Sequence, residues 1–192
     1  LERLSASIRS DHRRLQRVGE ITLLAIALAR SLTPAIGGVV TNDSLGYLTR
    51  SRDPLADGLI VQGYRQVAYP IWVRAAELLG TPFGWDYIFA VGVLQRALFV
   101  LGVVLIWQAL RLWATPLLLL VTSASLVGHT DFILPEGLLI PGCLVGAGLA
   151  ASAVNNRGIA KRFPKTTIVL SVALAMALGA VKLQYASLLL LA

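Results

Sequence analysis

Apolar blocks separated by short charged clusters run along most of this chain. The blocks approach the roughly 20 residues that a helix needs to cross about 30 Å of hydrocarbon. The shorter alternating segments that are typical of membrane barrels are not apparent in the sequence. The pattern therefore predicts an all-α, polytopic helical bundle integral to a membrane, with about five to six spans.

The block boundaries give the expected order of the chain. Residues 1–14 form a basic segment at the cytoplasmic membrane surface, and residues 15–192 form one transmembrane domain. The expected spans are residues 15–32, 86–108, 114–128, 134–154 and 166–181, with residues 182–192 starting a sixth. Because the chain starts without Met and stops within an apolar run, we expect a fragment of a longer polytopic protein, incomplete at its C-terminus. This leaves open whether the whole active site is present.

A polar interval, residues 34–85, separates the first two spans. Asn42 or Asp43 is suited to cap a short helix there, because either side chain accepts hydrogen bonds from the first N–H groups of a helix. A second, amphipathic helix is expected from about Tyr69, lying flat in the membrane interface. Its apolar side is made by Ile71, Ala75, Leu78 and Leu79, opposite Arg74 and Glu77.

The composition supports a bilayer environment. With 56% hydrophobic and 14% charged residues, the chain lies outside the range of soluble globular domains. Its net charge of +7 does not indicate nucleic-acid binding, because the basic residues lie at the ends of apolar blocks and form no single basic face. The lone cysteine, Cys143, lies in an apolar block and has no internal disulfide partner.

The distribution of lysine and arginine sets the expected orientation. A cytoplasmic N-terminus puts ten basic residues on the cytoplasmic side: Arg3, Arg9, Arg13, Arg14, Arg17, Arg111, Arg157, Lys161, Arg162 and Lys165. The other side then holds five: Arg30, Arg50, Arg52, Arg65 and Arg74. The polar interval with Asp43 is therefore expected on the extracytoplasmic side.

Two features inside the spans are expected to be structural. Arg96 is costly in a span unless it faces the protein interior and meets a carboxylate or a lipid phosphate. We expect it to be a buried partner between helices. The small residues Gly146 to Gly148 favour close packing between helices.

Polar groups gather on the expected outer side. Asp43 opens the first loop, and Asp131 and Glu136 flank the second, beside His129. Cations at the same level are Arg30, Arg65 and Lys182. Carboxylates beside cations suit one reaction, in which a base takes a proton from an acceptor hydroxyl while cations hold a phosphate leaving group.

The order of these segments resembles the start of the GT-C membrane glycosyltransferases. The resemblance rests on NDSLGYL after the first span, on GYRQVAYP and an amphipathic LL segment in the loop, and on LQRALFVLGVVLIWQALRLW in the second span. The hairpin LVGHTDFILPEGLLI is similar to their second external turn. The resemblance implies an inverting enzyme that moves a sugar from a polyprenyl-phosphate-linked donor to a hydroxyl of a glycan, lipid or protein acceptor. The expected location is a bacterial inner (plasma) membrane, with membrane lipids as partners and no nucleic acid.

The resemblance also implies roles for individual residues. Asp43 takes the position of the catalytic base, and Glu136 takes that of the second acidic residue. The residues that would bind substrate are Tyr47, Tyr64, Arg65, Tyr69, Arg30, Lys182 and His129. Asp43 is followed by Ser44, whereas several of these families carry an acidic pair. This departure leaves open the branch of the superfamily and the use of a divalent metal, although no metal site or cofactor is indicated.

Other interpretations of the same residues stay open. Asp43 can be only a helix cap, and Glu136 can be an ordinary acid of a helix N-terminus, favoured by the helix dipole. Asp131 and His129 are expected to be solvated loop residues. The alternative function is a transporter or lipid flippase with intramembrane charges on the solute path, and a non-catalytic membrane assembly subunit is a third.

Overall fold

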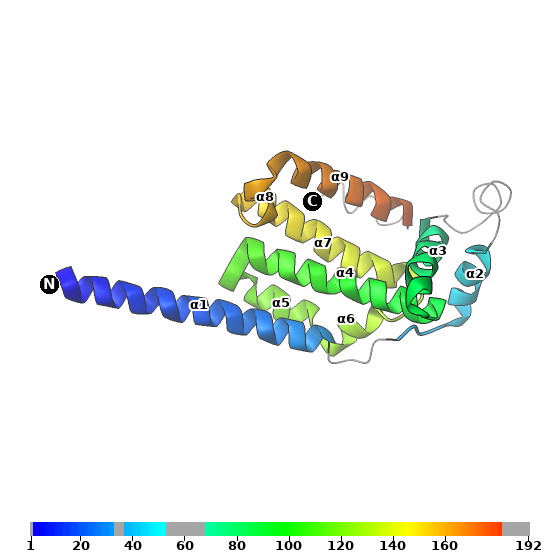
Figure 1. Ribbon diagram of the computed structural model, residues 1–192, viewed down its shortest axis with the longest axis horizontal. Coiled ribbons are helices and arrows are strands. Elements are labelled where there is room, and N and C mark those ends of the chain that lie inside the picture. The colour runs from blue at the N-terminus through cyan, green and yellow to red at the C-terminus, as the bar shows by residue number, and fades with distance from the viewer. Residues whose placement is uncertain (1, 33–36, 53–67, 182–192) are drawn as a thin grey trace.

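The computed structural model describes residues 2–32, 37–52 and 68–181. Every regular element in these ranges is a helix (Figure 1). The longer helices are α1 (Glu2–Leu32), α2 (Asn42–Arg50), α3 (Ala68–Gly80), α4 (Tyr87–Leu110), α7 (Pro135–Asn155) and α9 (Pro164–Val181). The shorter ones are η2 (Thr81–Phe83), η3 (Arg111–Ala114), α5 (Thr115–Val121), α6 (Ala124–His129) and α8 (Ile159–Arg162). The expected all-α fold class is confirmed for this part of the chain.

Helices α4 and α7 form the centre of the bundle. Glycines let them approach closely, since a Cβ on Gly102 would lie 2.6 Å from the Cβ of Leu144. A Cβ on Gly148 would lie equally close, 2.6 Å, to the Cβ of Leu105. α9 packs on α7, while α1 and α5 pack on α4 (Figure 1). The close packing expected of the glycines near position 146 is confirmed at Gly148.

The segment expected to form a third span is broken into two short helices. The chain turns back after α4 at Arg111, whose φ is 56°, and continues as α5 and α6. Between these helices the Thr122 hydroxyl donates to the Leu118 carbonyl, so this hydroxyl finds its hydrogen-bond acceptor within the last turn of α5. The seven residues of α5 extend for about 10 Å, against about 30 Å of hydrocarbon. The prediction of a single span over residues 114–128 is therefore wrong.

Two helical stretches, Tyr87–Val121 and Pro135–Asn155, are long and apolar enough to cross a membrane. They contain the second expected span and nearly all of the fourth, and a shorter apolar helix, Pro164–Ala177, overlaps the fifth. The first expected span retains three charged residues: Arg17, Glu20 and Arg30. The sixth lies outside the described residues. The count of five to six spans is thus not confirmed, and two spans are supported.

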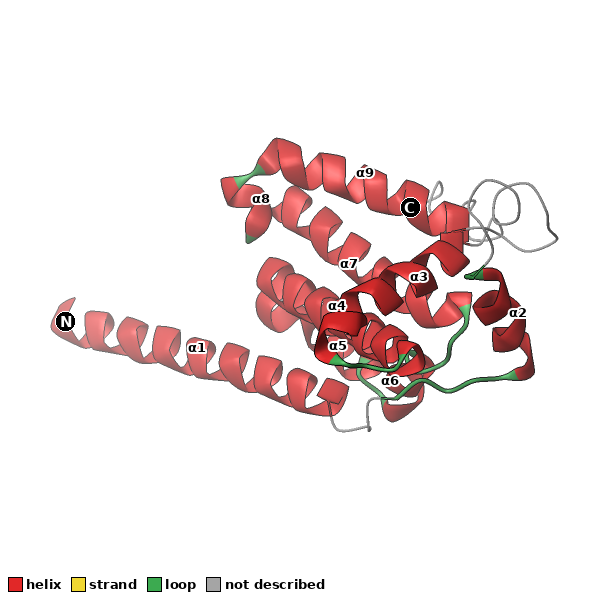
Figure 2. Cartoon of the chain, turned by 45° about the vertical axis from the view of Figure 1, so that its right-hand side comes forward, coloured by secondary structure: helices red, strands yellow, loops and turns green. Residues whose placement is uncertain are grey.

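The helices alternate in direction, so the bundle has two distinct ends (Figure 1). α2 and α3 lie across one end, where α1 finishes and α4 and α7 begin. At the other end α4 and α7 finish, beside α8. The N-terminal part of α1 extends beyond this second end (Figure 2). We call them the α2–α3 end and the α8 end.

Helix α3 has an exposed apolar side and a side that is buried in the bundle. Its expected apolar side stays exposed, at 43% for Ile71, 68% for Leu78 and 58% for Leu79, as a helix in the membrane interface requires. The predicted polar side, with Arg74 and Glu77, is half-buried. A third side, which carries Tyr69 and Val73, packs into the core shared with α2, α4 and α7. Tyr69 and Val73 on that side are fully buried, so α3 is fixed to the bundle while its apolar side remains uncovered.

Candidate functional site

A short parallel pairing brings the two predicted acidic residues to the same end of the molecule. Val39 donates its N–H to the Asp131 carbonyl over 2.7 Å, and Ile133 donates to the Val39 carbonyl over 3.1 Å. Val39 and Phe132 form the resulting bridge, with their segments running in parallel. Asp43 and Glu136 each lie four positions beyond the bridged residue of their own segment. Both therefore lie at the α2–α3 end.

The cap of α2 differs from the expected one. Thr41, and neither Asn42 nor Asp43, is the N-cap: its hydroxyl accepts the Ser44 N–H over 3.3 Å, while its own N–H donates to the Ser44 hydroxyl over 2.9 Å. This reciprocal capping box satisfies N–H groups that an Asp43 cap would otherwise have taken. The interpretation of Asp43 as the cap is wrong. Its side chain is exposed in the first turn of the helix.

Two tyrosines connect α2 to the rest of the site. Tyr47 lies one turn after Asp43, and its ring meets Tyr69 of α3 edge to face, with 5.2 Å between centroids and 83° between planes. Gln95 of α4 donates from Nε2 to the Tyr69 hydroxyl over 3.1 Å. Glu136 of α7 acts electrostatically on the same hydroxyl. We call Asp43, Tyr47, Tyr69, Gln95 and Glu136 the acid–tyrosine cluster.

The Tyr69 hydroxyl is kept protonated, and it accepts the hydrogen bond from Gln95. Burial raises the pKa of its hydroxyl well above the usual value, the hydrogen bond with Gln95 opposes this shift, and the charge of Glu136 adds to it. Gln95 Oε1 is buried and has no hydrogen-bond partner among the described residues. Both side chains are fully buried, so the pair joins α3 to α4 beneath Tyr47, and the predicted role of Tyr69 in substrate binding stays a prediction.

Gly137 keeps this region compact. A Cβ at Gly137 would lie only 3.1 Å from Gln95 Oε1 and would collide with the Phe132 carbonyl. Any larger residue would push the first turn of α7, and Glu136 with it, away from α4. The glycine therefore fixes how close Glu136 lies to the tyrosines.

Arg96 lies behind the cluster and joins three segments. Its side chain is 1% exposed, and its Nη2 donates to both Asp131 carboxylate oxygens at 2.7 and 2.6 Å. Nε donates to the Thr130 hydroxyl over 2.9 Å, and Nη1 donates to the Ser31 carbonyl over 2.7 Å. The prediction of a buried structural arginine paired with a carboxylate is confirmed. The prediction of a solvated Asp131 is wrong, because Arg96 requires a buried counter-charge.

Two of the other predicted substrate residues, Arg30 and His129, lie among the described residues. Arg30 is half-buried in the last turn of α1. His129 is exposed at the end of α6, as expected, with Nδ1 2.7 Å from the Ser125 carbonyl oxygen. Neither is among the contacts of the acid–tyrosine cluster. Tyr64, Arg65 and Lys182 lie outside the described residues, so their predicted roles are untested.

Sequence reasoning missed two parts of the site. Arg52 lies over the Tyr87 ring, with 5.1 Å from its guanidinium carbon to the ring centroid. These two residues line a cavity of about 350 Å³ together with Leu45, Leu48 and Thr49. The signal for Arg52 was its helical spacing from Leu45 and Leu48. Gln95 was also missed. The sequence did carry a signal for it, because a glutamine next to an arginine is unusual inside an apolar span.

Comparison with known proteins assigns no relative. No protein family, no curated protein and no solved structure matches this chain. Within the part of the chain that the structure describes, no three His, Cys, Asp or Glu side chains form a group that could hold a metal ion.

Proposed function

We propose that this protein is an integral membrane glycosyltransferase, with Asp43 as the base that activates an acceptor hydroxyl. The observation that carries the proposal is the acid–tyrosine cluster, which places two carboxylates and two tyrosines at the same end of the apolar helices. The Asp43 side chain is exposed in the first turn of α2, where an acceptor can reach it.

The proposed reaction is a single displacement. Asp43 accepts the proton of the acceptor hydroxyl while that oxygen forms a bond to the anomeric carbon of the donor sugar. The bond from this carbon to the polyprenyl phosphate breaks, and its electron pair leaves with the phosphate. Arg52 would stabilise the leaving phosphate, and Leu45 and Leu48 in the adjoining cavity would contact the first part of the polyprenyl chain. Tyr47, which is half-buried, would contact sugar or acceptor hydroxyls, and the fully buried pair of Tyr69 and Gln95 would hold Tyr47 in place.

The transporter alternative receives no support from Arg96. A charge on a solute path must be able to exchange partners, whereas this guanidinium is bound by Asp131, Thr130 and the Ser31 carbonyl. We therefore keep the enzyme as the proposed function.

The test is sugar transfer by membranes that contain the full chain. Polyprenyl phosphates that carry radiolabelled glucose, galactose, mannose or arabinose serve as donors, and incorporation into endogenous acceptors is measured. Asp43→Asn should lower transfer by about 10²–10⁴-fold, the usual contribution of a general base, because the amide cannot accept the proton.

Asp86→Asn is the matched control. It makes the same change at an exposed residue of the same end, where the Asp86 side chain makes no capping hydrogen bond to α4. It should leave transfer near the wild-type rate. Transfer by Asp43→Asn at the wild-type rate would refute the base assignment, and the absence of transfer by wild-type protein with every donor would refute the proposed donor class.

A further inference from the structure

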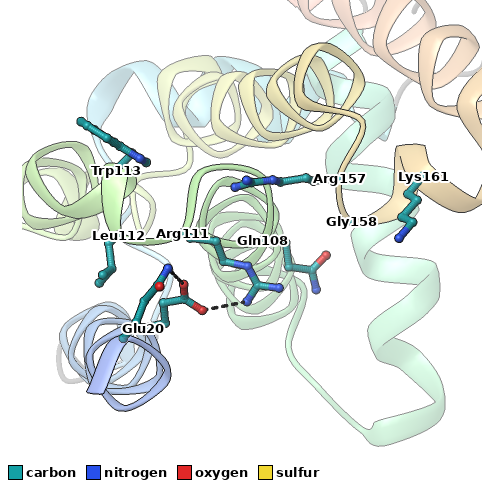
Figure 3. Close-up of a pocket in the computed structure, with 9 residues that line it drawn as sticks. Glu20, Gln108, Arg111, Leu112, Trp113, Arg157, Gly158 and Lys161 are labelled. Carbon is teal, nitrogen blue, oxygen red and sulfur yellow. Dashed lines mark hydrogen bonds and ion pairs between the residues drawn. The ribbon is translucent and has the colours of Figure 1, made fainter. Parts of the chain in front are cut away.

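A second polar cavity lies at the α8 end, opposite the acid–tyrosine cluster. It has a volume of about 750 Å³ and lies between α1, the end of α4 and the connection from α7 to α8 (Figure 3). Its lining includes three cations, Arg111, Arg157 and Lys161, and one carboxylate, Glu20. The lining charge is therefore +2, that is, three positive charges less one negative charge.

Arg111 is fixed in the wall of this cavity. Its guanidinium lies 4.4 Å from the centroid of the Trp107 ring and 3.7 Å from the Glu20 carboxylate. Trp107 in turn donates its indole N–H to the Glu20 carbonyl over 2.8 Å. Arg111 also has a φ of 56°, which is uncommon for a residue other than glycine. Such a conformation persists where the surrounding contacts determine it, and it often accompanies binding sites.

Arg157 and Lys161 add positive charge that the described residues do not neutralise. Both side chains are exposed, and neither forms an ion pair with a described carboxylate. In Figure 3 the Arg157 side chain is drawn near Arg111, and Lys161 lies apart from both, on α8. A ligand here would meet three cations with only one acid between them, which favours an anion.

The rim of the cavity is apolar and aromatic. Trp113 is 87% exposed and Leu112 is 39% exposed, and both line the cavity. Tryptophan is the residue typical of the headgroup level of a membrane. The cavity therefore combines a cationic lining with an apolar, aromatic edge suited to acyl chains.

We infer that this cavity binds the phosphate headgroup of an anionic phospholipid, with Arg111, Arg157 and Lys161 contacting the phosphate and Trp113 lying beside the acyl chains. Basic cavities between transmembrane helices at the cytoplasmic surface are suited to such headgroups. The cavity lies at the α8 end, away from the acid–tyrosine cluster, so the lipid site can be tested independently of the proposed function. Inorganic phosphate shares the same chemistry, and the experiment has to distinguish the two sources.

The test is native mass spectrometry of the full chain in detergent micelles. Dioleoylphosphatidylglycerol and dioleoylphosphatidylcholine are added separately, because they share acyl chains and differ in headgroup charge. The wild type should bind phosphatidylglycerol more tightly. The double variant R157Q/K161Q should lose affinity for phosphatidylglycerol on the order of tenfold while keeping its weak binding of phosphatidylcholine.

The matched control is R162Q/K165Q, which removes two charges near the same end from residues that do not line the cavity. It should bind phosphatidylglycerol like the wild type. Circular dichroism checks that each variant is folded, and Lys161→Glu replaces the first variant if that one is unfolded. Equal binding of the two lipids by wild type, or equal losses in both double variants, would overturn the inference. Displacement of the lipid by millimolar inorganic phosphate would overturn the assignment to a lipid.

Discussion

At the scale of single residues, the contacts of Arg96 hold together the chain segments that carry the two candidate carboxylates. Its guanidinium connects the end of α1, α4 and the turn before α7 through Ser31, Thr130 and Asp131. The backbone of Asp131 also accepts the N–H of Val39, whose segment leads into Asp43. One buried ion pair thus fixes both segments that carry the candidate carboxylates.

Breaking this ion pair should destabilise the protein strongly. Arg96→Met leaves the Asp131 carboxylate buried without a counter-charge, and we expect the free energy of unfolding to fall by about 3–5 kcal/mol. Adding Asp131→Asn removes that charge, so the double variant should be more stable than Arg96→Met alone. Denaturant unfolding in detergent micelles measures both.

Arg14→Met is the control for the removal of an arginine, because Arg14 is exposed on α1. It should change the free energy of unfolding by less than about 1 kcal/mol. If Arg96→Met were no more harmful than Arg14→Met, the ion pair would not hold the segments together.

The sequence predicted the burial and pairing of Arg96, but it did not predict the burial of its partner Asp131. A lone charge in an apolar span must be buried and paired, which follows from the cost of a charge in hydrocarbon. Asp131 was misjudged because a loop aspartate has no periodicity that reveals burial. The Asp43 cap was misjudged for a related reason, since Thr41 and Ser44 form a better reciprocal cap within the same four residues.

At the scale of helices, the contact between α4 and α7 sets the geometry of the bundle. The helices approach closely because Gly102 and Gly148 leave room for Leu144 and Leu105. Close backbone approach through small residues is a common way for apolar helices to associate in membranes. The same contact holds the first turn of α7, which carries Glu136, beside Gln95, which lies more than two turns into α4.

Two alanine substitutions test this contact. In Gly148→Ala the new Cβ would lie 2.6 Å from the Leu105 Cβ, so the helices must separate, and we expect a loss of about 1–3 kcal/mol in the free energy of unfolding. In Gly146→Ala the nearest atom would be 3.7 Å away, which is an ordinary contact with Leu174. This variant should keep or slightly gain stability, because alanine favours a helix over glycine. Equal unfolding free energies for the two variants would contradict the packing described here.

Element prediction succeeded where the apolar pattern was continuous and failed where side chains changed the backbone path. Residues 86–108 and 134–154 match α4 and α7 closely, because long apolar blocks have few alternatives to a helix in a membrane. Residues 114–128 look equally apolar, yet the turn at Arg111 and the break at Thr122 divide them. Neither the positive φ nor the hydroxyl-to-carbonyl bond is visible in hydrophobic periodicity.

At the scale of the whole molecule, the two ends carry different chemistry. The α2–α3 end holds carboxylates, tyrosines and Arg52, whereas the α8 end holds the cationic cavity with exposed Arg157 and Lys161. An excess of lysine and arginine marks the cytoplasmic side of membrane proteins. The α8 end is therefore expected in the cytoplasm, and the acid–tyrosine cluster is expected on the opposite side.

Cysteine labelling tests this orientation with two exposed asparagines, Asn42 at the start of α2 and Asn155 at the end of α7. Each is replaced by cysteine in a Cys143→Ala background, which removes the only native thiol. A membrane-impermeant maleimide should label Asn42→Cys in intact cells, and it should label Asn155→Cys only after permeabilisation, because the two positions lie at opposite ends of the spans. The reverse result would put Asp43 in the cytoplasm, where the proposed transfer would need a donor facing that side. Labelling of both positions in intact cells would mean that α7 does not cross the membrane, and the bundle would then have to be interpreted without its central span.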